Sequence, residues 1–389
     1  MRRQLLASYD FPPIGGGISR MMGEFAKRYP PGTLLVSTGS HPGSEAVDAD
    51  LPNRVDRIAV QSSRLRTMQG LLVWSHRARV LARSFRPRFV WCGNFKPAGY
   101  PALWVRRREG IPYGIFLYGT ELLLLRQRIA TSRRKSIAAK AILRHASVLV
   151  TISAWTRRLC LEVLAELGWN PDDFDVRTVH LGTDPRQFQP GIDTTGVRAR
   201  YGLDDGRWLI TVARLAAHKG VDTGLRVLAD LHRDYPDLRY AVVGSGIKLD
   251  QLQALAHELG VMDRVRFLTS VPDADLPAVY NCAEIYLGLS RPAELLIEGF
   301  GITFSEAAAC GIPAIGGLAG GIPDAVKDGE TGILVDSTDP RSVREVVRCL
   351  LEDRALGRRM GKAGRRAVER YYNWDRVTTD VRAIGEEFA

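Results

Sequence analysis

The 389-residue chain has no long hydrophobic run and no pattern of paired cysteines. No apolar stretch approaches the roughly 18–20 residues that a membrane-spanning helix requires, so we expect no transmembrane segment. A strand pattern begins within a few residues of Met1, which leaves no room for a signal peptide. The five cysteines are scattered and include no C-x-x-C motif: Cys92, Cys160, Cys282, Cys310 and Cys349. This argues against a disulfide framework or a cysteine zinc site and predicts a cytoplasmic protein with free thiols.

Acidic residues are scarce in the first half of the chain. Residues 51–161 contain 22 Lys or Arg and only three acids. Residues 1–180 contain 28 basic and 13 acidic side chains, whereas the remainder contains 26 and 30. This asymmetry suggests an anionic partner for the first half, such as a membrane surface, a nucleic acid or a phosphorylated substrate. An arginine-rich, solvated face is the simpler alternative.

The stretch 62–88 combines Leu, Val and Trp with arginines at helical spacing. A basic amphipathic helix of this kind can lie in an anionic membrane interface. It can equally pack its apolar side on a sheet, so the sequence leaves both interpretations open.

The length predicts two domains, and 45% hydrophobic with 25% charged residues is typical of a soluble globular protein. Strand-like and helix-like segments alternate throughout, which predicts two doubly wound α/β domains with parallel sheets. The expected strands lie in 3–9, 32–38, 88–93, 113–119, 146–153, 207–215, 239–246, 264–270, 283–289, 312–317 and 331–336. The expected helices include 18–28, 67–84, 221–235, 248–259, 275–281, 303–310 and 340–351. The polar segment 180–196 predicts the seam, with a cleft lined by loops at the carboxyl ends of the strands.

The segment VARLAAHKG places Arg214 and Lys219 after a strand and before a helix that begins near Val221. Two cations at the carboxyl end of a strand suit a diphosphate, because Arg offers a planar fork and Lys a mobile point charge. Ordinary surface charge is the alternative. The neighbouring His218 is better explained as a loop residue than as a catalyst.

Residues 292–317, PAELLIEGFGITFSEAAACGIPAIGG, place Glu298 in a Gly-rich loop and Glu306 in the helix that follows. Carboxylates accept hydrogen bonds from vicinal diols, so one can hold a sugar ring and the other a ribose. The amides of residues 299–303 would form an anion-accepting nest. The letters TFSE also fit a capping box with Thr303 as N-cap, which leaves Glu306 open between cap and ligand.

Three further turns follow strands. DFPPIGGGIS contains Gly16 and Gly17, and VVGSG contains Gly244; both fit either a phosphate turn or a tight packing turn. FLYGTELL places Glu121 just after a strand end. This acid either faces a substrate or pairs with a neighbouring Arg.

Taken together, these segments resemble the retaining glycosyltransferases of family GT4, which have the GT-B fold. The resemblance extends over essentially the whole chain. It rests on DFPPIGGGIS, YGTEL, TISAWTRR, LGTDPRQFQP, VARLAAHKG, VVGSG, IEGFGITFSEAAACGIPAIGG and GGIPDAVKDGETGILV, in that order. The branch that glycosylates phosphatidylinositol mannosides is the most similar.

The resemblance implies an N-terminal acceptor-binding domain over 1–185, a nucleotide-sugar-binding domain over 186–370, and a last helix in 371–389 that crosses back to the first. It assigns Arg214 and Lys219 to the donor diphosphate, Glu298 to the sugar hydroxyls and Glu306 to the ribose. Its other implied donor-binding residues are Gly16, Gly17, Gly244, Val271, Phe300, Gly301, Ile302 and Thr303. Gly119 and Glu121 fall on the acceptor side. Tyr118 replaces a His that positions the sugar in many relatives, and its catalytic role stays open because Tyr cannot hold a positive charge.

The implied reaction moves a mannose- or glucose-type hexose from a GDP- or UDP-sugar to a hydroxyl of a lipid-linked or polysaccharide precursor, with retention. No metal or other cofactor is expected, because Arg214 and Lys219 would neutralise the leaving diphosphate and no D-x-D follows a strand. A GT-B sugar-nucleotide epimerase or a glycosyl phosphorylase is the alternative enzyme. A nucleic-acid-binding protein is disfavoured, since the basic half lacks a recognised binding motif. The basic domain also predicts peripheral attachment to the inner face of the plasma membrane.

Overall fold

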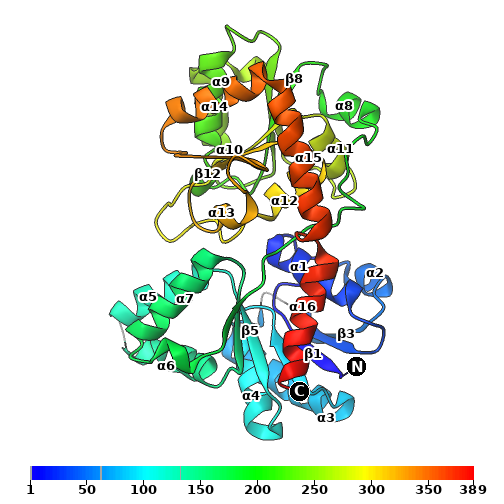
Figure 1. Cartoon of the computed structure of the whole chain (residues 1–389). Coiled ribbons are helices and arrows are strands. Elements are labelled where there is room, and N and C mark those ends of the chain that lie inside the picture. The colour runs from blue at the N-terminus through cyan, green and yellow to red at the C-terminus, as the bar shows by residue number, and fades with distance from the viewer. Residues whose placement is uncertain (1, 62–63, 132) are drawn as a thin grey trace. The chain divides into compact units, whose positions relative to one another are not determined.

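The computed structural model describes residues 2–61, 64–131 and 133–389, and the chain forms two compact α/β units (Figure 1). Unit 1 consists of Met1–Val179 and Trp374–Ala389, and unit 2 of His180–Asn373. The division thus falls at the start of the polar segment 180–196, before residue 185. Residues 62–63, which open the basic stretch 62–88, lie outside the described residues. Within the described ranges, no helix is both long enough and apolar enough to cross a bilayer.

Unit 1 is built on a parallel sheet whose described strands run in the order β3-β2-β1-β4-β5-β6-β7. The strands are β1 (Gln4–Ala7), β2 (Leu34–Ser40), β3 (Arg54–Gln61), β4 (Phe89–Cys92), β5 (Tyr113–Leu117), β6 (Val148–Thr151) and β7 (Val176–Thr178). The helices are α1 (Gly17–Arg28), α2 (Ser44–Ala49), α3 (Met68–Phe85), α4 (Gly99–Glu109), α5 (Thr120–Thr131), α6 (Arg133–Arg144) and α7 (Ala154–Glu166). The strand order reverses between β1 and β4, and open α/β sheets bind ligands at such a switch point.

The two edge strands of unit 1 are absent from the strands expected from the sequence. β3 reads RVDRIAVQ and carries a buried acid, Asp56, which pairs with Arg77 of α3 at 2.5 Å. β7 is only three residues long. Neither strand is a continuous apolar run, because an edge strand buries less apolar surface than a central strand. The pattern used to predict strands therefore does not mark them.

The last helix, α16 (Trp374–Glu387), belongs to unit 1 although it follows unit 2 in the sequence. It packs against α1 (Figure 1). The buried side chain of Gln4 on β1 connects it to the sheet, because its Nε2 donates to the carbonyl of Arg382 at 3.2 Å. Its Oε1 accepts from the Tyr29 hydroxyl and the Trp91 indole, each at 2.9 Å. The helix thus lies on the first unit, as the resemblance implied.

Unit 2 repeats the arrangement with a parallel sheet in the order β10-β9-β8-β11-β12-β13, so the predicted pair of doubly wound domains is confirmed. Its strands are β8 (Arg207–Val212), β9 (Leu238–Val243), β10 (Val265–Leu268), β11 (Ile285–Gly288), β12 (Ala314–Gly317) and β13 (Gly332–Val335). Its helices are α8 (Thr195–Tyr201), α9 (Val221–Leu231), α10 (Leu249–Glu258), α11 (Leu276–Asn281), α12 (Ile302–Ala309), α13 (Ile322–Ala325), α14 (Pro340–Glu352) and α15 (Arg354–Arg370). α9 ends at Leu231, four residues short of the expected end at 235. Pro236 disfavours helical conformation at residue 235.

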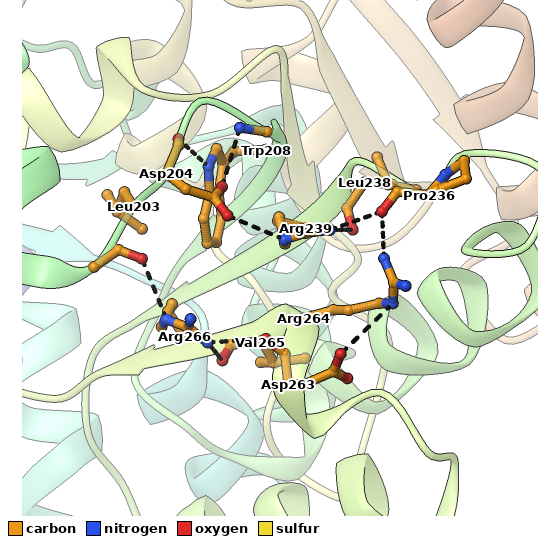
Figure 2. Close-up of polar contacts among 12 residues, drawn as sticks. Leu203, Asp204, Trp208, Pro236, Leu238, Arg239, Asp263, Arg264, Val265 and Arg266 are labelled. Carbon is orange, nitrogen blue, oxygen red and sulfur yellow. Dashed lines mark hydrogen bonds and ion pairs between the residues drawn. The ribbon is translucent and has the colours of Figure 1, made fainter.

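Arginine side chains donate hydrogen bonds to backbone carbonyls near the amino ends of β8, β9 and β10 in unit 2 (Figure 2). Arg239 and Arg264 both donate to the carbonyl of Pro236, at 2.9 and 2.5 Å. Arg266 donates to the carbonyl of Gly202 at 3.2 Å. These cations satisfy backbone carbonyls at the edge of the sheet opposite to the carboxyl ends, so their role is structural.

Candidate functional site

Two of the predicted site residues meet at the carboxyl ends of β8 and β11. The Nζ of Lys219 forms an ion pair with the carboxylate of Glu298, and the two side chains are 17% and 18% exposed. Ser290 Oγ donates to the same carboxylate oxygen at 3.5 Å. Burial disfavours the charged carboxylate, but the ammonium of Lys219 outweighs it and holds the pKa of Glu298 below its ordinary value. The Glu298 carboxylate is therefore charged at neutral pH.

A short turn fixes Lys219 in place. Ala217–Lys219 forms one turn of 3-10 helix, and Gly220 follows with φ of +68° as the N-cap of α9. A Cβ at Gly220 would lie 2.0 Å from the carbonyl oxygen of Leu289, so only glycine fits where the turn crosses the end of β11. The same segment also hydrogen-bonds to the turn, since the amide of Arg291 donates to the His218 carbonyl at 2.8 Å.

Arg214 lies on the same loop and is exposed. It has no hydrogen-bond or ion-pair partner within residues 2–61, 64–131 and 133–389. An arginine without a protein partner, a few residues from a charged Lys–Glu pair, is free to bind an anion.

His218, which the sequence argument set aside as a loop residue, is 4% exposed. Its Nδ1 has no hydrogen-bond partner in the described part of the chain. Burial and the neighbouring cations Lys219 and Arg214 outweigh the attraction of Glu298 and lower the pKa of His218 to about 4. The imidazole is therefore neutral at physiological pH.

The start of α12 rules out the capping box. The helix begins at Ile302, and its N-cap is Gly301 with φ of +94°. Thr303 is thus inside the helix, and its Oγ1 accepts a hydrogen bond from the Tyr286 hydroxyl at 2.6 Å. Glu306 is 1% exposed and accepts from the Tyr280 hydroxyl at 2.8 Å, so the capping interpretation of Thr303 and Glu306 is wrong. The ribose-binding role of Glu306 stays a prediction.

The ring of Phe304 anchors α12 to the sheet. It is 2% exposed and packs where Gly288 of β11 has no side chain, since a Cβ there would lie 2.1 Å from the ring. A Cβ at Gly301 would lie 2.6 Å from the same ring. Phe300 is also buried, at 1% exposed, and stacks on His180 with ring centroids 6.0 Å apart. The ring of Phe300 is therefore enclosed, and the donor-binding role of this residue stays a prediction.

The remaining predicted residues of unit 2 lie at the same edge of the sheet. Gly244 directly follows β9, and a Cβ there would lie 2.1 Å from the carbonyl oxygen of Ala213, so tight packing together with φ of +127° explains this glycine. Val271 is half-buried and follows β10. The carbonyl of Glu298 accepts from the amide of Gly321 at 2.9 Å, which joins the Glu298 loop to the segment after β12.

In unit 1, the residues predicted on the acceptor side form a capped helix start. The carboxylate of Glu121 accepts from the amides of Tyr118 and Gly119, at 2.5 and 3.4 Å. Glu121 has no Arg partner among the described residues, so the pairing alternative is wrong. Burial raises the pKa of Glu121 despite these amide hydrogen bonds. The Tyr118 hydroxyl donates to the carbonyl of Gly93 at 2.7 Å.

Gly16 is the N-cap of α1, with φ of +120°, and Gly17 is the first residue of that helix. Both are exposed, and a Cβ at Gly16 would meet no heavy atom within 4 Å. The φ of Gly16 is one that other residues rarely adopt, so the backbone conformation already favours glycine there, whereas packing within unit 1 does not require it. A backbone that a ligand approaches closely remains the hypothesis for both positions.

Asp10 and Asn94, which were not among the residues predicted from the sequence, follow β1 and β4 at the switch point of unit 1. Asn94 Nδ2 donates to the carboxylate of Asp10 at 2.8 Å. Asn94 is 6% exposed, and its Oδ1 has no partner in the part of the chain that the structure describes. Each of these two polar residues closely follows a buried central strand, and that sequence feature could have marked both as candidate site residues. No group of three or more His, Cys, Asp or Glu among the described residues could hold a metal ion.

Residues 195–367 match the model of the family described as "Glycosyl transferases group 1". The chain is 30% identical over 379 residues to the GDP-mannose-dependent alpha-(1-6)-phosphatidylinositol monomannoside mannosyltransferase of Mycolicibacterium smegmatis, covering 95% of this chain and 94% of the relative. The protein of the same name from Mycobacterium tuberculosis is 30% identical over 98% of this chain and 97% of its own length. Among solved structures, Anabaena Alr3699/HepE in complex with UDP and glucose has a TM-score of 0.80 and 17% identity, covering 99% of this chain and 100% of that one.

Proposed function

The chain belongs to the group 1 glycosyltransferases and is a hexosyltransferase, and from this premise we propose its substrates and mechanism. It transfers a mannose- or glucose-type hexose from a nucleoside diphosphate sugar to a hydroxyl of a glycolipid or glycan precursor, with retention of the anomeric configuration. The relatives named above use GDP-mannose and a phosphatidylinositol monomannoside, so we take GDP-mannose and a glycolipid as the first donor and acceptor to test.

The observation that carries the proposal is the arrangement of Arg214, Lys219 and Glu298 at one edge of the unit 2 sheet. Breaking the anomeric C–O bond leaves negative charge on the diphosphate and positive charge on the sugar. Arg214 and Lys219 supply the cations for the first, an electrostatic contribution that is usually the largest in catalysis. Glu298, kept ionised by Lys219, accepts hydrogen bonds from the sugar hydroxyls.

Retention needs no separate base in this scheme. The departing phosphate oxygen accepts the proton of the acceptor hydroxyl on the face from which it leaves. Retaining glycosidases instead need two carboxylates about 5–5.5 Å apart. The roles of Gly16, Gly17, Tyr118, Gly119 and Glu121 toward the donor and the acceptor stay predictions within this proposal.

We expect GDP or UDP, at a concentration of about 100 Kd, to raise the melting temperature by about 5 °C. Arg214→Ala should melt normally without ligand, because the side chain has no protein partner, and should lose most of the nucleotide shift. Arg226→Ala is the matched control, since Arg226 is also exposed, on α9, without a partner in the described residues. A panel of nucleotides and nucleotide sugars that leaves wild-type melting unchanged would contradict the proposal. Product that forms from donor alone, or only with inorganic phosphate, would favour an epimerase or a phosphorylase.

Helix α3 supports the further proposal that unit 1 docks on an anionic membrane. Its inner side is buried on the sheet through Trp74 and Ala78, as the packing interpretation predicts. Its outer side is also apolar: Met68 is 75% exposed, Leu72 63% and Val80 40%. Successive positions in this set are four and eight residues apart, so the three side chains span about 120° of the outer side of the helix, with the exposed His76 and Arg83 between them. A solvated basic face does not require apolar residues there, whereas a membrane interface does.

Flotation with vesicles containing an anionic phospholipid tests this docking. We expect Leu72→Asp to weaken binding about tenfold or more, because it removes apolar surface from the interface and adds a repelled charge. Leu318→Asp is the control, since Leu318 is 65% exposed in unit 2. Equal binding to neutral and anionic vesicles, or equal loss in both variants, would remove the proposal.

A further inference from the structure

His218 occupies an unusual position for a buried polar side chain. It lies on the turn between Arg214 and Lys219, where its own carbonyl accepts from the amide of Arg291. Its ring is nine-tenths enclosed or more, yet Nδ1 has no hydrogen-bond partner among the described residues. Most buried polar atoms are hydrogen-bonded, and each exception requires an explanation. The tautomer explains this one: Nδ1 is the acceptor nitrogen of the ring, and an unpaired buried acceptor is less rare than an unpaired N–H, which leaves the N–H on Nε2 to meet a ligand.

The charge state of the ring follows from its neighbours. The charged groups that act on it are Lys219, Arg214 and Glu298. Two cations and burial oppose protonation, and one carboxylate favours it, so the ring carries one N–H and one lone pair at neutral pH. A neutral donor beside two cations adds hydrogen-bonding capacity for an anion without adding to their mutual repulsion.

The tautomer follows from the cost of leaving either nitrogen unpaired. A buried N–H without an acceptor is rarer in proteins than a buried acceptor without a donor. Since Nδ1 is fully enclosed and unpaired, the proton belongs on Nε2. A ligand can then reach the ring only at Nε2, which meets it as a donor.

We propose that His218 donates a hydrogen bond from Nε2 to a diphosphate oxygen of the nucleotide-sugar donor, an inference that rests on the proposed function. His218 thus binds the donor between the two cations, and it adds to the leaving-group site a neutral contact that the cations cannot replace. It is a donor-binding residue and transfers no proton.

Isosteric amides separate this role from simple packing. The side-chain amide nitrogen of Gln lies where the Nε2 of His lies, and that of Asn lies where Nδ1 lies. We expect His218→Asn and His218→Phe to weaken GDP or UDP binding about tenfold or more, as expected for a hydrogen bond to a charged acceptor. His218→Gln should bind within about threefold of wild type because it keeps a donor at the Nε2 position. His232→Gln is the control, since this His contacts the Ala229 carbonyl at the end of α9.

Calorimetric titration of the full-length chain with GDP and with UDP decides the question. Weak binding by the Asn variant with retained binding by the Gln variant supports the proposal, even if the Phe variant fails to fold. Wild-type affinity in both amide variants overturns it, and so does an equal loss in both, because packing and not the N–H then matters. The ratio of wild-type to Asn affinity should be the same at pH 6 and pH 8; a ratio that falls with rising pH would indicate a cationic His218. If wild type binds neither nucleotide, the proposed function itself fails and this inference with it.

Discussion

Lys219→Met is expected to lower kcat for hexosyl transfer by about 10²–10³-fold, the loss typical of removing one preorganised group that stabilises transition-state charge. The substitution acts twice. It removes a cation from the leaving diphosphate, and it leaves the Glu298 carboxylate partly buried without its ion-pair partner. Steady-state rates with donor and acceptor measure the first effect. Lys327→Met is the control, since Lys327 is exposed and its contact with Glu330 is a surface pair.

The second effect has a definite pH dependence. In wild type the pKa of Glu298 is lowered, so its contribution to stability is present above the unfolded value of 4.5 and is lost as pH falls through the folded value. Without Lys219, burial dominates and raises that pKa, so the charged form destabilises the variant at neutral pH. We expect a loss of about 2–3 kcal/mol at pH 7, less than for a fully enclosed pair. The difference from wild type should shrink between pH 7 and pH 5, and a difference that is constant with pH would contradict this account.

Gly301→Ala should reduce both stability and donor affinity. Alanine strains a backbone with φ of +94°, and its Cβ collides with the ring of Phe304. The ring cannot withdraw, because it already fills the space left by Gly288 and packs edge-on against Tyr286 at 5.1 Å. We expect a loss of about 3–4 kcal/mol, the sum of left-handed strain and overpacking. Because the start of α12 must shift, nucleotide-sugar affinity should fall about tenfold or more.

Gly311→Ala is the control for Gly301→Ala, because it introduces the backbone strain of a positive φ without a collision between the new Cβ and a ring. Gly311 has φ of +75°, but a Cβ there would meet only the side chain of Pro190, at an ordinary 3.6 Å. This variant should lose only about 1–2 kcal/mol and bind the donor normally. Denaturant unfolding gives both stabilities, and titration gives both affinities. If the two alanine variants behave alike, Phe304 is not the anchor of the α12 start.

The sequence predicted the central strands because apolar runs between helical segments mark strands buried on both faces. It did not predict β3, since Asp56 looks like a surface residue until Arg77 is known to pair with it from another element. The TFSE letters at 303–306 fit a capping box, but the φ of Gly301 starts the helix earlier. Backbone conformation at a single glycine is not visible in a residue pattern.

The residue types of the candidate site were predictable, but their partners were not. Arg214 and Lys219 stand out because they follow a strand. The pairing of Lys219 with Glu298 joins segments 79 residues apart in the sequence, and the contact of Glu306 with Tyr280 joins segments 26 apart. His218 shows the same limit, since the residue whose amide donates to its carbonyl, Arg291, is 73 positions away in the sequence.

The position of α16 has a consequence for how the chain is made. The N-terminus of a nascent chain leaves the ribosome first. All of His180–Asn373 therefore emerges before α16, the helix that packs on α1. Until then Gln4 lacks the Arg382 carbonyl, and α1 lacks its contact with α16. Domains generally fold as units during synthesis. The unit that is synthesised second can therefore complete its fold first, while the unit synthesised first waits for the last residues of the chain.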